Sequence, residues 1–402
     1  MIYNRSVDKG YLNQFIPEAF EYLTKQKKLE FNGQNIKTDY LINIIHELMM
    51  RYYVYKNDTI DKELKFPLSS ILLRKKYGHL YNYYINFLRE KEFIIMTSDY
   101  FNGKSARIYK INRTYLTDIK WVQVSDKILL KKNSKEFLKT TFLNYNKSPI
   151  PMEIRKKLVD DLYDVKIDAT AALNYLKQLR DDKNISYDKY MKNTMSVENL
   201  KSDNIFFKFD EYGRMHTNFT VLKKHIRKNF LTIDGQQLIE LDISNSQPLF
   251  LAVLMKRELS ASKLINPEFT RFFNLVKSGL IYEELVNKCE VEDRDQAKHM
   301  MFVVLFGQNG ERAKYNKMFK TVFPDVLQFI KDYKTEKNDH KELSHVLQNL
   351  ESNFIFDVVV SHVMESYPDI KMFTVHDSLS VSLKDKNKVL EIFEYHQRKL
   401  LS

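Results

Sequence analysis

The sequence has 402 residues, 44% of them hydrophobic, which is enough for two or three domains with buried cores and excludes a disordered chain. Its formal net charge of +12 makes an anionic polymer an expected partner, although a lysine-rich proteome would give the same charge. Only 9 glycines and 8 prolines favour long helices over a turn-rich β architecture. The single cysteine, Cys289, excludes an internal disulfide and a cysteine-based zinc site.

Neither a targeting signal nor a membrane span is predicted. Residues 1–5 lack the apolar core of a signal peptide. The longest apolar runs, 248–255 and 300–306, are too short to cross a bilayer. We therefore expect a cytoplasmic protein without a membrane partner.

Residues 1–118 are predicted to form a small nucleic-acid-binding domain. Three helices (41–55, 68–76 and 81–91) precede two strands (93–96 and 106–111), with the hairpin signal Asn102-Gly103 between the strands. This is the order of a winged helix, whose second helix of the helix–turn–helix would enter a major groove. The expected nucleic-acid contacts are Lys75, Lys76, Lys104 and Arg107. A winged-helix-like module that is structural or binds protein is the alternative.

Residues 119–205 are predicted to be helical and basic, as a thumb-like region. Helices are expected at 127–143, 152–162 and 170–180. Their lysines could hold a nucleic-acid backbone without reading bases, or they could form a solvated face. Residues 206–402 alternate strands with helices, which predicts an α+β fold. Strands are expected at 206–210, 238–243, 373–376 and 379–383, and helices at 294–306 and 387–401.

Two aspartates stand at the ends of predicted strands. Asp242 ends an apolar run and begins Asp242-Ile243-Ser244, and Asp377 follows His376 in the turn after another apolar run. Each aspartate taken alone is typical of a helix cap or a turn. A pair of carboxylates is also what metal-dependent nucleotidyl transfer needs.

The helix predicted at 294–306 carries cations and aromatic rings on one stripe. Arg294, Lys298, Phe302 and Phe306 follow at intervals of four, so they stay near one face and drift by about 40° per step. An arginine fork and a lysine charge suit a triphosphate, and rings suit a sugar and a base. An ordinary core stripe with solvated basic ends is the alternative.

The three segments in this order resemble the family A DNA polymerases and the related single-subunit phage-type RNA polymerases. Asp242-Ile243-Ser244 is similar to the first palm motif, residues 294–307 to the nucleotide-binding fingers helix, and His376-Asp377-Ser378 to the second palm carboxylate motif. The resemblance covers residues 206–402, and Gly213-Arg214-x-His216-Thr217 is similar to a segment that contacts primer and template. It implies a right-hand polymerase palm with an antiparallel sheet and helical fingers and thumb, here preceded by the winged-helix-like domain.

The resemblance implies catalytic roles for five positions. Asp242, Asp377 and the backbone carbonyl of Ile243 would hold two Mg²⁺ ions about 3.5–4 Å apart, which Mn²⁺ could replace. These ions would lie between the attacking 3′-hydroxyl and the leaving pyrophosphate. Arg294 would bind the terminal phosphate, and Lys298 would bind the phosphates and protonate the pyrophosphate.

Other positions would contact the nucleotide and the nucleic acid. Phe302 would pack against the incoming sugar, Phe306 would stack at the template–nucleotide pair, and His376 would lie by the primer end. Gly307 would let the chain turn next to Phe306. The remaining expected contacts are Ser244 and Gln247 to the nucleotide, and Arg214, His216 and Gly307 to the nucleic acid.

Three positions depart from the DNA polymerase pattern. Gln247 stands where a glutamate usually blocks a 2′-hydroxyl, Phe306 where tyrosine is usual, and Ser378 where those enzymes usually have glutamate. The sugar preference therefore stays open. Phe302 favours deoxynucleotides, because the phage-type RNA polymerases usually carry methionine there.

The expected function is template-directed DNA synthesis, with nucleoside triphosphates added to a primer 3′-hydroxyl. Proofreading is not expected, because residues 1–205 contain no Asp-x-Glu site in an exonuclease-like context. The enzymatic alternatives are an RNA polymerase or primase and a template-independent terminal transferase. The non-enzymatic alternative is a nucleic-acid-binding replication protein with a relic palm.

Overall fold

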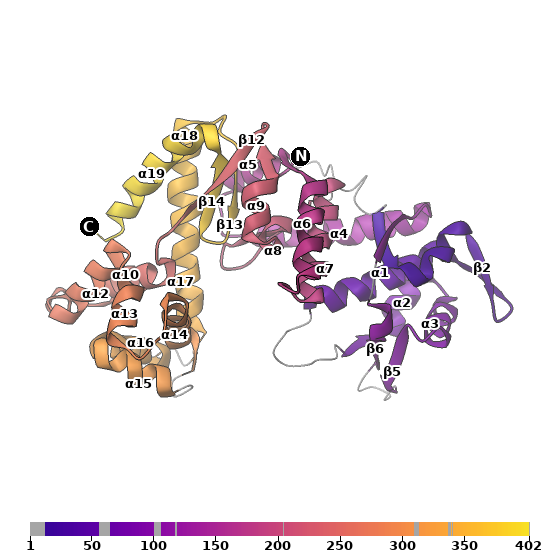
Figure 1. Cartoon of the computed structure of the whole chain (residues 1–402), viewed down its shortest axis with the longest axis horizontal. Helices are drawn as coiled ribbons and strands as arrows, with labels where there is room; N and C mark the ends of the chain where they lie inside the picture. The colour runs from indigo at the N-terminus through magenta and orange to yellow at the C-terminus, as the bar shows by residue number, and fades with distance from the viewer. Residues whose placement is uncertain are drawn as a thin grey trace. The chain divides into compact units, whose positions relative to one another are not determined.

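The computed structural model describes residues 13–55, 65–99, 106–116, 119–203, 205–308, 313–336, 339 and 341–401. Helices and antiparallel strands are mixed along the chain (Figure 1). The chain divides into two compact units. Unit 1 contains Met1–Leu143, Ile167–Phe206 and Val221–Lys223, and unit 2 contains Asn144–Lys166, Phe207–Thr220 and Lys224–Ser402. The helical region expected at 119–205 thus contributes to both units.

Unit 1 is built around the buried helix α1 (Thr38–Tyr55). A three-stranded antiparallel sheet has the order β4-β6-β5, and two strand pairs, β1 with β7 and β2 with β3, complete the strands described in this unit. Helices α6 and α7 pack against each other. The bounds are β1 Asn13–Pro17, β2 Lys28–Phe31, β3 Gln34–Lys37, β4 Lys65–Leu68, α2 Ser70–Tyr77, α3 Tyr81–Glu90, β5 Ile94–Ser98, β6 Arg107–Ile111, β7 Ile119–Gln123, α6 Ala169–Asp181 and α7 Tyr187–Lys201.

Local signals explain where α2 and α3 begin and end. The Ser69 side chain caps α2 by accepting a hydrogen bond from the backbone N–H of Leu72, and Gly78 ends this helix at a φ of 81°. Helix α3 buries its apolar stripe, Tyr84 to Leu88, and leaves polar residues exposed. Both predicted helices are confirmed. The tip of the predicted hairpin, with Asn102-Gly103 and Lys104, lies outside the described residues.

Unit 2 contains a five-stranded sheet in the order β13-β14-β12-β11-β8. The central strand β12 pairs antiparallel with β14, and β14 pairs with β13. A two-residue turn, Asp234-Gly235, joins β11 to β12 with both φ angles positive, as tight hairpins require. The bounds are β8 Val165–Ile167, β11 Leu231–Ile233, β12 Gln236–Asp242, β13 Met372–Val375 and β14 Ser378–Ser382, and a separate hairpin holds β9 Phe207–Phe209 and β10 Met215–Thr217.

Helices flank this sheet. The almost fully buried α10 follows β12 and packs against α17. Helices α17, η3 and α18 form one continuous helical segment, of which η3 is a π-helix, a conformation found often at functional sites (Figure 1). The bounds are α5 Met152–Leu162, α9 Lys224–Phe230, α10 Ser246–Glu258, α12 Pro267–Ser278, α13 Ile281–Lys288, α14 Arg294–Phe306, α15 Ala313–Val322, α16 Pro324–Glu336, α17 Glu342–Asn353, η3 Phe354–Val360, α18 Ser361–Ser366 and α19 Lys386–Lys399, whereas α4 Lys127–Lys147 belongs mostly to unit 1.

The shorter helices are connectors. They are η1 Glu18–Lys25, η2 Arg113–Tyr115, α8 Asn218–Val221, α11 Ala261–Leu264 and η4 Leu383–Asp385. Across the helices that the structure describes, none combines the length and the apolar character needed to traverse a lipid bilayer.

Candidate active site

Asp242 and Asp377 lie at the same end of two adjacent strands. Asp242 is the last residue of β12, and its Cα partner across the ladder is Ser378, the first residue of β14. Asp377 immediately precedes Ser378 in the two-residue turn after β13, where His376 adopts a φ of 55°. The antiparallel register therefore brings together two carboxylates that are far apart in the sequence.

The charges of these two aspartates are only partly compensated by nearby cations. Burial, followed by the negative charges of Glu351 and Asp242, raises the pKa of Asp377 to about 7. Desolvation also raises the pKa of Asp242, although its side chain stays open to solvent and the nearby Lys224 opposes the shift. Within the described ranges, neither aspartate forms an ion pair. Such a pair of acids is poised to accept a cation.

Glu351 is a third carboxylate beside the pair, and no sequence motif indicated it. Its side chain in α17 is 2% exposed. Oε1 accepts a hydrogen bond from Arg214 Nη2 at 2.5 Å, and Oε2 accepts from Ser246 Oγ at 2.6 Å and from Gln247 Nε2 at 2.5 Å. Gln247, expected at the nucleotide, is thus held by Glu351 at the start of α10.

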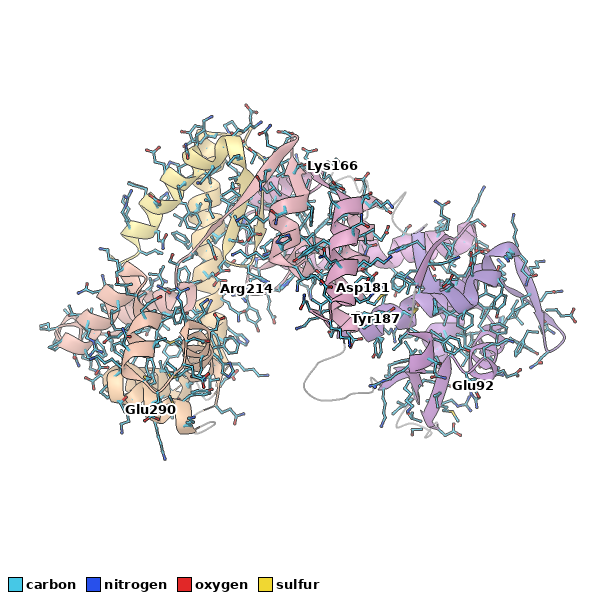
Figure 2. All side chains as sticks on the ribbon, in the orientation of Figure 1. Glu92, Lys166, Asp181, Tyr187, Arg214 and Glu290 are labelled. Atoms are coloured by element: carbon cyan, nitrogen blue, oxygen red, sulfur yellow. The ribbon has the colours of Figure 1, made fainter. Side chains whose placement is uncertain are left out.

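The β9–β10 hairpin carries the predicted primer–template residues Arg214 and His216. Asp210 Oδ1 accepts hydrogen bonds from the backbone N–H groups of Tyr212 and Arg214, and Asp210 Oδ2 lies 2.8 Å from His216 Nε2. Burial alone would raise the pKa of Asp210, but the His216 and backbone hydrogen bonds outweigh it and lower that pKa. Figure 2 labels Arg214 on this hairpin.

The hairpin is anchored to α17 and faces the turn after β13. The Gly213 carbonyl accepts a hydrogen bond from Ser352 Oγ at 2.7 Å, and a Cβ on Gly213 would clash with this same oxygen. The φ of 84° also favours glycine here. The His216 and His376 rings approach edge to face with centroids 6.4 Å apart, so the hairpin lies beside the Asp377 turn.

Helix α14 has the predicted bounds and presents the predicted stripe to solvent. Arg294, Lys298 and Phe302 are exposed, Phe302 by 60%, and Phe306 packs edge to face on Phe302 with centroids 4.7 Å apart. The opposite face of the helix is the core face, which comprises Ala297, Met300, Met301, Val304 and Leu305. The alternative that Phe302 and Phe306 form a core stripe is therefore wrong for Phe302.

The start of α14 packs against Tyr282 and Glu283 of α13. Arg294 stacks over the ring of the buried Tyr282 at 5.3 Å and pairs with Glu283 at 2.9 Å. Burial raises the pKa of Tyr282 to about 12, with the Arg294 charge opposing and the Asp377 charge adding to the shift. Tyr282 thus lies within electrostatic range of both Arg294 and Asp377. Sequence spacing did not indicate Tyr282.

The end of α14 is closed by a glycine and a buried lysine. A Cβ on Gly307 would lie 2.7 Å from the Val303 carbonyl oxygen, so close approach explains the glycine. Its φ of −74° is ordinary. Lys334 Nζ donates to the Val304 and Gly307 carbonyls at 2.8 Å each. These bonds hold the C-terminal turn of α14, which carries Phe302 and Phe306.

The remaining predicted residues near the pair have mixed environments. The side chain of Ile243 is buried, and that of Ser244 is exposed. Ser378 is buried and donates to the Val375 carbonyl at 2.8 Å, a contact inside the turn that carries Asp377. Ser378 therefore stabilises the turn in this structure.

The basic residues predicted to bind nucleic acid in unit 1 differ in availability. Lys75 is exposed. Lys76 is largely buried and pairs with both Glu47 and Glu136, so its charge is already compensated. Arg107 forms an exposed pair with Asp99 at 2.9 Å. Of these three, Lys75 is the most available for a phosphate.

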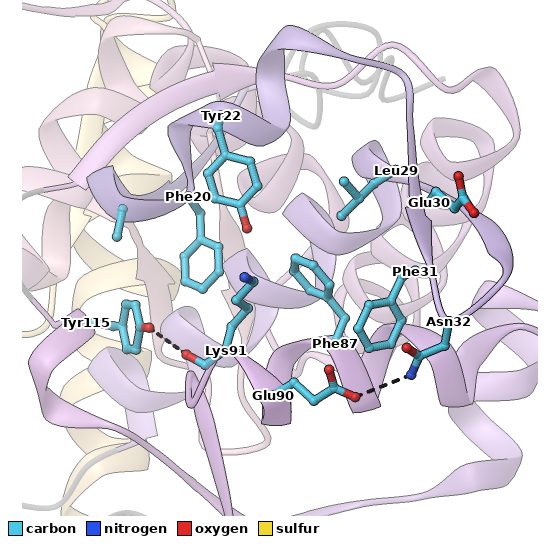
Figure 3. A pocket seen from close by; sticks show the side chains of 11 residues that line it. Phe20, Tyr22, Leu29, Glu30, Phe31, Asn32, Phe87, Glu90, Lys91 and Tyr115 are labelled. Atoms are coloured by element: carbon cyan, nitrogen blue, oxygen red, sulfur yellow. Dashed lines mark hydrogen bonds between the residues drawn. The ribbon is translucent and has the colours of Figure 1, made fainter.

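Unit 1 also contains a cavity of about 720 Å³, which Figure 3 shows from close by. Its wall is rich in aromatic rings, and Tyr115 donates a hydrogen bond to the Lys91 carbonyl. None of the residues predicted for catalysis or binding lines it. The aromatic lining residues are Phe20, Tyr22, Phe31, Phe87 and Tyr115.

Neither the protein-family models nor the curated proteins contain a match to this chain. Among solved structures, the chain is similar to the POL domain of Pol1 from M. smegmatis in complex with DNA primer-template and dNTP. The sequence identity is 12% and the TM-score is 0.41, over 67% of this chain and 70% of that chain. Site residues are accordingly assigned from the geometry of this chain.

Proposed function

We propose that this protein is a template-directed polymerase that adds nucleotides, with deoxynucleotides as the expected substrates, to a primer 3′-hydroxyl. The observation that carries the proposal is the juxtaposition of Asp242 and Asp377 at adjoining strand ends without a compensating ion pair among the described residues. Two carboxylates so placed are suited to divalent cations and hence to phosphoryl chemistry.

The donor chemistry of this pair fits Mg²⁺. Carboxylate oxygens are the hard ligands that Mg²⁺ prefers, and a cation would offset the burial and the repulsion that together raise the pKa of Asp377. The described residues include no cluster of three or more His, Cys, Asp or Glu able to hold a metal. The other ligands would be the Ile243 carbonyl, water and substrate phosphates, as is usual for Mg²⁺. When bound, Mg²⁺ would activate the 3′-hydroxyl and neutralise phosphate charge.

The exposed stripe of α14 would bind the incoming nucleoside triphosphate. The pairs that Arg294 and Lys298 form, with Glu283 and Asp295, are solvent-exposed. Exposed pairs contribute little stability, so phosphate oxygens could replace these carboxylates at small cost. The 60% exposed Phe302 ring would cover the sugar. A ring exposed to this extent contributes little to packing in the folded chain, which supports a role for Phe302 in ligand binding.

The reaction would be an in-line displacement. The primer 3′-oxygen attacks the α-phosphorus of the nucleotide, its proton passes to a water molecule, and the bond from the α-phosphorus to the pyrophosphate oxygen breaks. Arg294 and Lys298 would stabilise the charge that develops on the pyrophosphate, and Lys298 would give it a proton. The protein contributes positioning and electrostatic stabilisation.

Unit 1 would supply a nucleic-acid-binding module. The order α1, β4, α2, α3, β5, β6 and the sheet order β4-β6-β5 support the winged-helix interpretation. The exposed side of α3 presents Asn82, Asn86 and Arg89. Asparagine and arginine are side chains that read base edges in a major groove.

Primer extension with Mg²⁺ tests the proposal. DNA and RNA templates, and a primer without template, are each supplied with dNTPs or NTPs. Incorporation that depends on the template and fails in Asp242→Ala and Asp377→Ala is the expected result. Extension with NTPs alone would favour an RNA polymerase or primase, and extension without template a terminal transferase. If no combination gives incorporation, the polymerase proposal is wrong, and the remaining hypothesis is a nucleic-acid-binding protein with a relic palm.

A further inference from the structure

Glu351 connects the segments that surround the carboxylate pair. Ser246 and Gln247, which it binds, lie just after Asp242-Ile243-Ser244 at the start of α10. Its third partner, Arg214, belongs to the β9–β10 hairpin, and the next residue, Ser352, bonds to the hairpin carbonyl of Gly213. One turn of α17 thus fixes the positions of two segments next to the aspartates.

The charge of Glu351 is also placed to act on the aspartates. Its carboxylate is 2% exposed and contacts Ser246 and Gln247, four and five residues after Asp242. A charge that is poorly screened by water acts more strongly on its neighbours than an exposed one. Arg214, its ion-pair partner, is bound at one of the two carboxylate oxygens.

We propose that Glu351 is a positioning residue whose negative charge increases the affinity of the Asp242–Asp377 site for divalent cations while its hydrogen bonds hold α10 against the β9–β10 hairpin. A carboxylate that does not itself coordinate a metal still attracts the cation and orients the groups around its ligands. This inference rests on the proposed function, because it requires that the two aspartates bind the metal.

The decisive measurement is Mn²⁺ binding to the full chain without nucleotide, followed by the electron paramagnetic resonance signal of free Mn²⁺. The Asp242→Asn/Asp377→Asn variant identifies the signal that belongs to this site. Glu351→Gln keeps the shape of the side chain and removes its charge. We expect it to weaken Mn²⁺ binding by roughly three- to tenfold, the effect of one charge at this range in a partly solvated site.

Glu268→Gln is the matched control. Glu268 is also a partly buried carboxylate in unit 2, and it accepts hydrogen bonds from the backbone N–H groups of Asp325 and Val326. Its partners belong to the start of α16 and not to the segments that adjoin Asp242 and Asp377. This variant should bind Mn²⁺ as the wild type does, so a loss common to both variants would overturn the proposal.

A second comparison avoids the risk that Glu351→Gln unfolds because Arg214 loses its anion. Arg214→Gln alone and Arg214→Gln/Glu351→Gln should differ in Mn²⁺ affinity by a similar three- to tenfold factor. Equal affinities within both comparisons would overturn the inference and leave the proposed function standing. If the wild type gives no signal that depends on Asp242 and Asp377, the metal site fails, and the proposed function and this inference fail with it.

Discussion

The two halves of the candidate site differ in how their charges are held. At the sheet end, Asp242, Asp377 and the buried Glu351 place negative charges together, and burial raises the pKa of Asp377 to about 7. On α14, Arg294 and Lys298 are about half exposed and pair with exposed acids. The sheet end is preorganised at a cost in stability, whereas the helix face is open and costs little. Substitutions at the sheet end should therefore lower activity while raising stability, and substitutions on the exposed face of α14 should lower activity without changing stability.

The largest expected effect is from Asp377→Asn. If Asp377 is a metal ligand, nucleotide incorporation should fall by about 10³-fold, since a bound cation contributes several kcal/mol of charge stabilisation. The same change should raise the unfolding midpoint of the metal-free protein at pH 8, because it removes a buried, repelled charge. Primer extension and thermal unfolding in a chelator measure the two effects. A lower unfolding midpoint of Asp377→Asn at pH 8 would contradict the view that the charge of Asp377 destabilises the folded state.

The pH dependence of that stability has a defined sign. The folded pKa of Asp377, about 7, lies above the ordinary aspartate value of 3.8. Its protonation therefore favours the folded state fully below pH 3.8, and this contribution is lost as the pH rises through 7. The difference in unfolding midpoint between wild type and Asp377→Asn should widen from pH 5 to pH 8. A constant difference over this range would contradict the raised pKa.

Lys298→Ala should reduce kcat/KM for the nucleotide by about 10²-fold, the usual cost of losing one charged donor at a developing negative charge. Its exposed side chain pairs weakly with Asp295 at 3.6 Å, so the unfolding midpoint should not change. Steady-state primer extension and thermal unfolding test this separation. Lys317→Ala, which removes a lysine charge from α15, serves as the control and should leave kcat/KM near the wild-type value.

Phe302→Ala should raise the KM for the nucleotide by about tenfold, since the contact between the ring and the sugar removes apolar surface from water, at about 25 cal/mol per Å² buried. Because Phe302 is 60% exposed, the folded state should lose little stability. Met300→Ala on the buried face of the same helix is the contrasting variant. It should lower the free energy of unfolding by about 2–5 kcal/mol. Equal destabilisation by both variants would show that Phe302 belongs to the core.

The smallest effect concerns Lys334, which is buried at the end of α14. Burial lowers its pKa to about 8, below the ordinary lysine value of 10.5. The unfolded chain then binds more protons than the folded chain between these values, so this residue makes stability rise with pH from 8 to 10.5. Lys334→Met should lose that rise, as comparison of denaturant midpoints at pH 8 and pH 10 would show. An unchanged slope would contradict the assignment.

Much of the local structure could be predicted from the sequence. The bounds of α14 and α5, and the positions of β12, β13 and β14, follow from apolar periodicity and turn residues, which act over a few neighbouring residues. The sequence was a poorer guide to which charged side chains are free to bind a ligand. Lys76 looked available for a phosphate, but two glutamates, one of them on α1, compensate its charge.

The sequence by itself determined the strands next to Asp242 and Asp377 and the helix at 294–306 with its chemistry-bearing stripe, because spacing records local conformation. Only the tertiary structure decided that Asp242 and Asp377 share one end of a sheet, that the Phe302 side of α14 is exposed, and that Glu351 joins the site. Strand register and the packing of α17 depend on contacts between residues far apart in the chain. A buried carboxylate also acquires its role from such distant partners, which no spacing pattern records.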